Sequence, residues 1–200
     1  MQASKITIPM FPLKLVVIPG EEVKLHIFED RYKQLLSDVE NHESTFGIPV
    51  MMEDTMLNLG AEVELIKVTD RYDGGEADII VKGKKLFSII GFYQELPEKL
   101  YGGGQAKIMD LEKFEASKEI KNEFIEFINQ YHADKEYPSD IDSFNLFDMA
   151  NHLFLNPIQK LKLINNKTIE TREEIIRAQM RFLVIIMMQE RKIENNFYPN

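Results

Sequence analysis

Few residues in this chain have the types and spacing that catalysis requires. None of its seven serines lies in a Gly-x-Ser-x-Gly motif or precedes a lysine by three residues, and its four histidines include no His-x-x-x-His pair. Cysteine is absent, which excludes thiolate nucleophiles, zinc-thiolate sites and disulfides. The stretch Lys82–Lys85 lacks the spacing and the hydroxyl group of a phosphate-binding loop. We therefore predict that the chain is not an enzyme and holds neither a metal nor a cofactor.

Carboxylates gather around the sequence Asp73-Gly74-Gly75. Two adjacent glycines allow the positive φ angles of a tight turn, so this sequence predicts a β-hairpin. Asp70, Asp73, Glu76 and Asp78 surround the turn, and such a cluster could attract a cation weakly. Exposed hairpins often carry charges for solubility, and we interpret the four carboxylates in that way.

Methionine has the most unusual distribution of any residue type here. The chain has ten methionines, and three of them fall within the nine-residue segment Met51–Leu59. Their flexible, polarizable side chains suit a surface that adapts to varied apolar ligands. We predict that Met51, Met52, Met56 and Leu57 bind polypeptide. A strand that enters the core and a loop packed against it would explain the same pattern. The pair Met187-Met188 is interpreted as packing between helices.

The overall charge argues against nucleic acid as a partner. Lys and Arg number 24 against 33 Asp and Glu, which gives a net charge of −9 without any strongly basic segment. The longest apolar run, Phe182–Met188, is far shorter than the roughly 20 residues that span a bilayer. The N-terminal residues lack the pattern of a secretory signal. We expect a cytoplasmic protein that has no membrane segment and binds no nucleic acid.

The first half of the chain has the short β-branched runs and the Gly and Pro residues typical of strands. The predicted strands are Ile6–Phe11, Leu15–Ile18, Val23–Phe28, Phe46–Met52, Ala61–Thr69, Ala77–Val81, Leu86–Phe92 and Gln105–Leu111. One helix is expected between them, because Tyr32, Leu35, Leu36 and Val39 recur at helical spacing. The sequence from Tyr101 to Gly104 predicts a flexible loop.

Helical spacing replaces strand spacing after Phe114. We expect a helix from about Ile120, a second from a cap at Ser139 or Asp140 to Leu155, and a third that begins at Asn156-Pro157. A capping box at Thr171–Glu174 is expected to open a long last helix. The sequence thus predicts an α+β fold with a strand-rich subdomain, residues 1–114, and a helical bundle subdomain, residues 115–200. We expect the bundle to pack on the strand-rich half, since the last helix has a broad apolar face.

Three segments near the N-terminus, Ile8–Leu13, Val17–Gly20 and Leu25–Tyr32, resemble the N-terminal substrate-binding domain of the ATP-dependent protease Lon. The resemblance continues through Phe46–Ile48, Gly60–Val63 and Val81–Phe87. It implies a PUA-like β-barrel or pseudo-barrel followed by a helical bundle, in a stand-alone domain without the ATPase and peptidase modules. It also implies a structural motif, formed by Phe11, Pro12, Pro19, Gly20, Phe28, Arg31, Tyr32 and Gly83.

Within that motif, we expect the prolines and Gly20 to fix turns. Phe11, Phe28 and Tyr32 are expected to fill the junction between the strands and the first helix. The function that the resemblance implies is non-catalytic recognition of polypeptide, either apolar client segments or a partner protein such as a separate protease or ATPase. RNA binding by the PUA-like half is the alternative, and it rests on fold analogy alone. The acidic charge argues against it.

Overall fold

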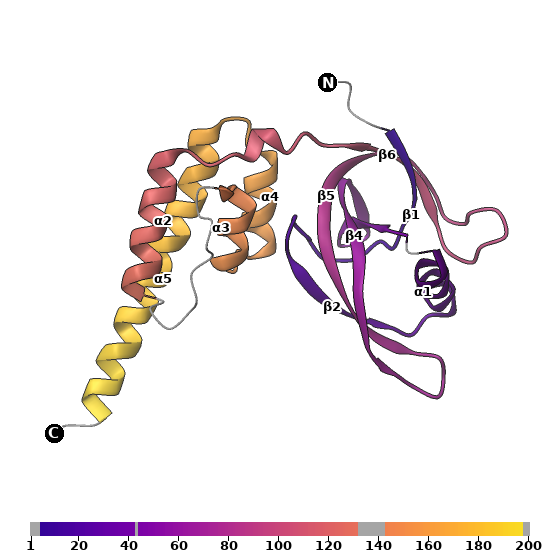
Figure 1. The fold of residues 1–200 in the computed structure, drawn as a ribbon, viewed down its shortest axis with the longest axis horizontal. Helices are drawn as coiled ribbons and strands as arrows, with labels where there is room; N and C mark the ends of the chain where they lie inside the picture. Colours follow the sequence, from indigo (N-terminus) through magenta and orange to yellow (C-terminus); the bar gives the residue numbers. More distant parts are fainter. Residues whose placement is uncertain (1–4, 43, 132–142, 198–200) are drawn as a thin grey trace. The chain divides into compact units, whose positions relative to one another are not determined.

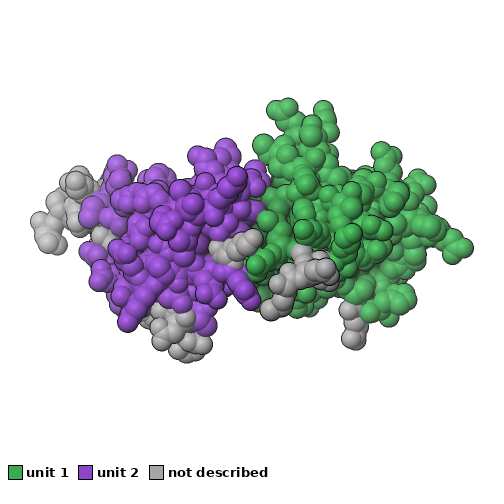
Figure 2. Space-filling view, turned by 90° about the horizontal axis from the view of Figure 1, so that it is seen from above, with its two compact units in different colours: residues 1–111 green, residues 112–200 purple. Residues whose placement is uncertain are grey.

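The computed structural model describes residues 5–42, 44–131 and 143–197 (Figure 1). The chain divides into two compact units, residues 1–111 and residues 112–200 (Figure 2). The first unit carries the strands and one helix, and the second is helical. Each unit is therefore described by itself.

The first unit is built on a six-stranded antiparallel sheet. Its strands are β1 (Lys5–Pro9), β2 (Glu22–Ile27), β3 (Phe46–Met52), β4 (Thr55–Arg71), β5 (Ala77–Tyr93) and β6 (Gly103–Ile108). The strand order is β1-β6-β5-β4-β3, and β2 pairs with β5. The α+β class predicted from the sequence is confirmed.

The sheet is not closed, so the expected barrel is not confirmed. β1 and β3 lie at the two ends of the strand order. The chain that follows β1 approaches β3 through two isolated parallel bridges, Met10 with Gly47 and Leu13 with Val50. Met10, which makes one of these bridges, belongs to a buried cluster with Ile8, Phe87 and Ala106.

Two long strands form most of the sheet. β5 is continuous where the sequence predicts two separate strands, and β4 changes register against it at three places. Such bulges increase the local twist and bend, which lets long strands curve around a core. The expected strand at Leu15–Ile18 is wrong: Val16, Val17 and Ile18 are buried, but they lie outside the named strands.

The hairpin predicted at Asp73-Gly74-Gly75 is confirmed. It joins β4 to β5, and Tyr72 N donates a hydrogen bond to Glu76 O at 2.9 Å across the turn. Gly75 has a φ angle of +77°, a conformation that a side chain would strain. The local sequence is therefore sufficient to specify this turn.

The helix α1 (Asp30–His42) connects β2 to β3, as the apolar spacing predicts, and it buries Tyr32, Leu35, Leu36 and Val39. On its polar side, Asp38 Oδ2 accepts hydrogen bonds from Lys99 Nζ at 2.8 Å and from the Tyr101 hydroxyl at 2.7 Å. These hydrogen bonds hold the pKa of the Asp38 carboxyl below its usual value. Burial, and then the hydrogen bond to Asp38, raise the pKa of Tyr101.

The segment Tyr101–Gly104 is not the flexible loop that its glycines suggest. Tyr101 and the three glycines are buried, and β6 begins at Gly103. A Cβ atom on Gly102 would lie 2.6 Å from Tyr93 O, and one on Gly104 would overlap Gly91 O. The glycines are needed here because two backbones approach each other too closely for a side chain.

The residues of the expected structural motif divide into two groups. Phe11 packs on Tyr32 with ring centroids 3.8 Å apart, and the Arg31 guanidinium lies 4.5 Å from the Tyr32 ring centroid. Phe28, which was expected to fill the same junction, is 58% exposed, so that expectation is wrong. Phe28 follows Ile27, the buried last residue of β2, and alternation along a strand directs successive side chains to opposite faces.

The second group fixes the turn after Ile18. Gly20 has a φ angle of +81°, and its N–H donates to Gly83 O at 2.8 Å. Gly83 N in turn donates to Glu21 O at 2.9 Å. A Cβ atom on Gly83 would overlap Ile18 O, so both glycines are required where this turn meets β5.

The second unit is a helical bundle that ends in a long helix. It contains the short 3-10 helix η1 (Glu112–Phe114) and the helices α2 (Lys118–Tyr131), α3 (Leu146–His152), α4 (Pro157–Asn165) and α5 (Ile169–Phe197). Its core includes Phe114, Ile120, Phe124, Phe147 and Ile176, all nearly inaccessible to solvent. None of the helices in the described part of the chain is both long and apolar enough to cross a membrane.

The first residues of the helices can be compared with the predicted caps. The cap at Asn156-Pro157 is confirmed by a capping box with Gln159. The caps expected at Ser139 and Asp140 lie outside the described residues, and α3 begins only at Leu146, with Asn145 as its cap. The capping box expected at Thr171 is wrong, because α5 begins at Ile169 and the Thr168 hydroxyl accepts from Thr171 N at 3.3 Å.

Candidate functional site

The tip of the β3–β4 hairpin carries the four residues that the sequence predicts as a binding surface. Met51 pairs with Met56, and Met52 pairs with Thr55, directly before and after the turn. Leu57 follows on β4. The four residues thus share one hairpin end, where alternation along the strands places Met51 and Met56 on one face and Met52 and Leu57 on the other.

The burial of β3 falls sharply toward this tip. Residues 46–50 are buried, Met51 is half-buried and Met52 is 48% exposed. On β4, Met56 and Leu57 are half-buried, and Leu59 is the first residue in the core. The alternative interpretation, that this segment enters the core, therefore holds for Leu59 but not for Met52.

The hairpin tip is held on both sides. Met51 N donates to Leu13 O at 2.8 Å, and Leu13 N donates to Pro49 O at 3.0 Å, so half-buried Leu13 lies beside the methionines. On the other strand, Asn58 Oδ1 accepts from Ile89 N of β5 at 2.7 Å. Sequence reasoning missed Leu13, because only the tertiary pairing of distant segments places it there.

The turn itself is acidic. Glu53 has a φ angle of +53°, and both Glu53 and Asp54 are exposed. Carboxylates beside flexible apolar side chains favour a ligand that combines apolar and basic groups.

A second exposed cluster lies where β2 meets the β4–β5 hairpin, and sequence reasoning named its Asp78 but missed His26 and Tyr72. His26 Nδ1 lies 2.6 Å from Asp78 Oδ1, and the Tyr72 hydroxyl donates to Asp78 Oδ2 at 2.7 Å. The hydrogen bonds from Tyr72 and His26 lower the pKa of Asp78. The His26 ring stacks with Phe28 at a centroid distance of 5.9 Å.

This second cluster is explained by local pairing. Asp78 of β5 lies opposite His26 of β2 and opposite Asp70 of β4, so two of the four carboxylates predicted around the hairpin face each other on its strands. The cluster bonds internally, which agrees with a role in fixing β2 to the hairpin. Within the described part of the chain, no three acidic or histidine side chains come close enough to hold a metal ion.

Comparison with known proteins decides the family. The family model of the ATP-dependent protease La (LON) substrate-binding domain matches residues 7–189 of the 200-residue chain. The chain belongs to this family. The resemblance seen in the sequence is confirmed, and membership supports a general role in substrate recognition. The matched Lon domain is the non-catalytic substrate-binding part of the protease.

Solved structures of Lon N-terminal domains share the fold. The Lon N-terminal domain protein from Xanthomonas campestris is 21% identical, with a TM-score of 0.64 over 86% of this chain and 98% of that one. The N-terminal domain of the Mycobacterium avium complex Lon protease is 16% identical, with a TM-score of 0.62 over 88% of this chain and 98% of that one. Among curated proteins, none matches this chain.

Proposed function

We propose that this Lon-type domain recognises polypeptide through the β3–β4 hairpin tip, with apolar segments of clients as its ligands. One observation carries the proposal: Met51, Met52, Met56 and Leu57 are all at least partly exposed at the end of a hairpin whose base is buried. A hairpin end with a buried base can present apolar groups without loss of core packing. Glu53 and Asp54 keep the unliganded tip soluble.

The chemistry of the tip favours clients that combine apolar and basic residues. Methionine side chains can repack around different shapes at low cost, which suits recognition without a fixed sequence. Contacts on a small surface must offset the translational and rotational freedom that the ligand loses on binding. We therefore expect an affinity on the order of micromolar for a single site.

The fold subtype, the cellular compartment and the partner protein are also proposals. We infer that the open sheet and its two bridges correspond to the PUA-like pseudo-barrel of the family. The absence of cysteine is compatible with work in the cytoplasm, and a separate protease or ATPase is the partner that family membership suggests. RNA is not favoured as a ligand, because the chain carries a net charge of −9.

A titration with labelled peptide tests the proposed function. We expect a peptide of alternating apolar and basic residues to bind the wild-type protein, and Met52→Asp/Met56→Asp to lose that binding by at least about tenfold. Because Met52 is exposed and Met56 only half-buried, the melting temperature should change little.

The control places the same charge on another exposed apolar side chain, as Leu100→Asp. This variant should bind like the wild type. A large drop in the melting temperature of the double variant would mean that the methionines serve the core. Unchanged binding by a stable double variant would exclude the hairpin tip as the site.

A further inference from the structure

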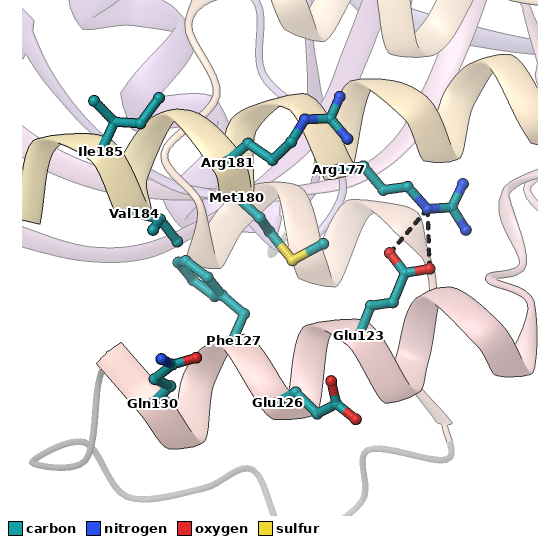
Figure 3. A pocket seen from close by; sticks show the side chains of 9 residues that line it. All are labelled: Glu123, Glu126, Phe127, Gln130, Arg177, Met180, Arg181, Val184 and Ile185. Atoms are coloured by element: carbon teal, nitrogen blue, oxygen red, sulfur yellow. Dashed lines mark hydrogen bonds and ion pairs between the residues drawn. The ribbon is translucent and has the colours of Figure 1, made fainter. Parts of the chain in front are cut away.

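The helices α2 and α5 enclose a groove within the second unit. They run side by side in the same direction along the chain (Figures 1 and 3). The groove has a volume of about 490 Å³. Phe127 of α2 and Met180 and Val184 of α5 form its apolar floor. Ile185 extends the apolar surface along the helix.

Among the described residues, none covers the apolar part of α5. Phe182–Met188 is a run of seven consecutive apolar residues, which places apolar side chains all around the helix. None of the seven is buried, and Ile185 and Met188 are 54% and 51% exposed. The expectation that Met188 packs between helices is therefore wrong. Helices that are apolar on all sides are normally buried, so this surface is suited to an interface.

The two rims of the groove carry opposite charge. Glu123 and Glu126 lie on the α2 rim, and Arg177 and Arg181 lie on the α5 rim. Glu123 and Arg177 pair within the chain, with Arg177 Nε 2.8 Å from Glu123 Oε2. Glu126 and Arg181 are exposed, and the contact of Arg181 with Glu174 is an exposed ion pair of little energetic value.

The opposite charges of the two rims determine which kind of partner the groove fits. A two-fold rotation about an axis that runs along the groove exchanges the α2 rim with the α5 rim. In the resulting pair, acidic rims face basic rims twice, and the two apolar floors meet. A client segment with one sign of charge would instead meet a like charge on one rim.

We propose that this groove is the interface with a second copy of the chain. In the symmetric dimer, Glu126 of each copy faces Arg181 of the other, and Ile185 and Met188 pack against the partner. The proposal is independent of the hairpin tip, which lies in the other unit.

Charge reversal at the two rims tests this dimer. Light scattering during gel filtration should give twice the 23.3 kDa of one chain for the wild type at high concentration. Glu126→Arg and Arg181→Glu should each weaken dimerisation by about tenfold or more, because each variant opposes like charges twice. An equal mixture of the two variants should dimerise again, since both facing pairs become opposite in charge.

The matched control, Lys167→Glu, makes the same charge change as Arg181→Glu on an exposed residue outside the groove and should dimerise like the wild type. Circular dichroism melts of all variants should coincide at low concentration. A wild-type chain that stays monomeric at high concentration overturns the proposal. So does a dimer that both reversed variants retain, or a mixture that fails to recover, and these results would leave the groove to a different partner.

Discussion

At the scale of single residues, Asp38 joins α1 to the chain before β6. Its carboxylate accepts from both Lys99 and Tyr101, and Tyr101 is almost fully buried. A buried hydroxyl that loses its acceptor costs more than an average hydrogen bond contributes. This single side chain therefore fixes the position of the helix relative to the glycine-rich start of β6.

We predict that Asp38→Ala lowers the free energy of unfolding by about 1–3 kcal/mol, because it leaves the Tyr101 hydroxyl without its acceptor. Urea denaturation measures this loss. Ser37→Ala, at the exposed neighbouring position, should stay within about 0.5 kcal/mol of the wild type. Equal stability of the two variants would contradict the assigned role of Asp38.

The pH dependence of stability follows from the same contacts. The pKa of Asp38 is lowered in the folded state, so its contribution is present above its unfolded value of 3.8 and is lost as the pH falls through the lower folded value. The stability advantage of the wild type over Asp38→Asn should therefore shrink in acid.

The pKa of Tyr101 is raised from 10.0 in the folded state, so its contribution to stability is present below pH 10.0 and is lost as the pH rises further. Thermal melts from acid to alkaline pH measure both the loss of stability in acid and the loss in alkali.

At the scale of elements, local signals were sufficient where the chain interacts with its own neighbours. Asp73-Gly74-Gly75 specifies its hairpin, and Asn156-Pro157 specifies a helix start. The sequence failed where burial depends on distant segments. The glycines before and in β6 meet the backbone of β5, and Leu13 reaches the candidate site by pairing with β3. Neither contact leaves a signal in the local sequence.

Two glycines in paired strands provide a matched test of close backbone approach. A Cβ atom on Gly104 would overlap Gly91 O, whereas one on Gly91 would meet nothing within 4 Å. We predict that Gly104→Ala destabilises the protein by more than about 2 kcal/mol and that Gly91→Ala changes stability by less than about 1 kcal/mol. Chemical denaturation measures the stability of both variants. Equal losses of stability would contradict a close backbone approach at Gly104.

At the scale of the whole molecule, the proposed dimer would give one particle two hairpin tips. Two weak sites on one particle bind a client with two apolar segments more tightly than either site alone. The sequence also predicts that the helical half packs on the strand-rich half. That stays a prediction, and a fragment ending at Phe114 that is as stable as the whole chain would contradict it.

We predict that Arg181→Glu weakens binding of a client with two apolar segments by about tenfold, since it removes the second tip from the particle. It should leave binding of a single-segment peptide unchanged, because the tip itself is intact. Parallel titrations with the two ligands measure the difference. An equal loss for both ligands would place Arg181 at the client site itself.

The central claim is that the hairpin tip contacts the client, and the methionine methyl groups report this directly. Carbon-13 labelling of the methyl groups of all ten methionines gives NMR signals from both units, which single Met→Leu variants can assign. On titration with the apolar and basic peptide, we predict that the signals of Met51, Met52 and Met56 shift together, while those of fully buried Met10 and Met149 stay in place. Bound peptide with unmoved hairpin signals, or with shifts confined to Met180, Met187 and Met188 of α5, would contradict the claim.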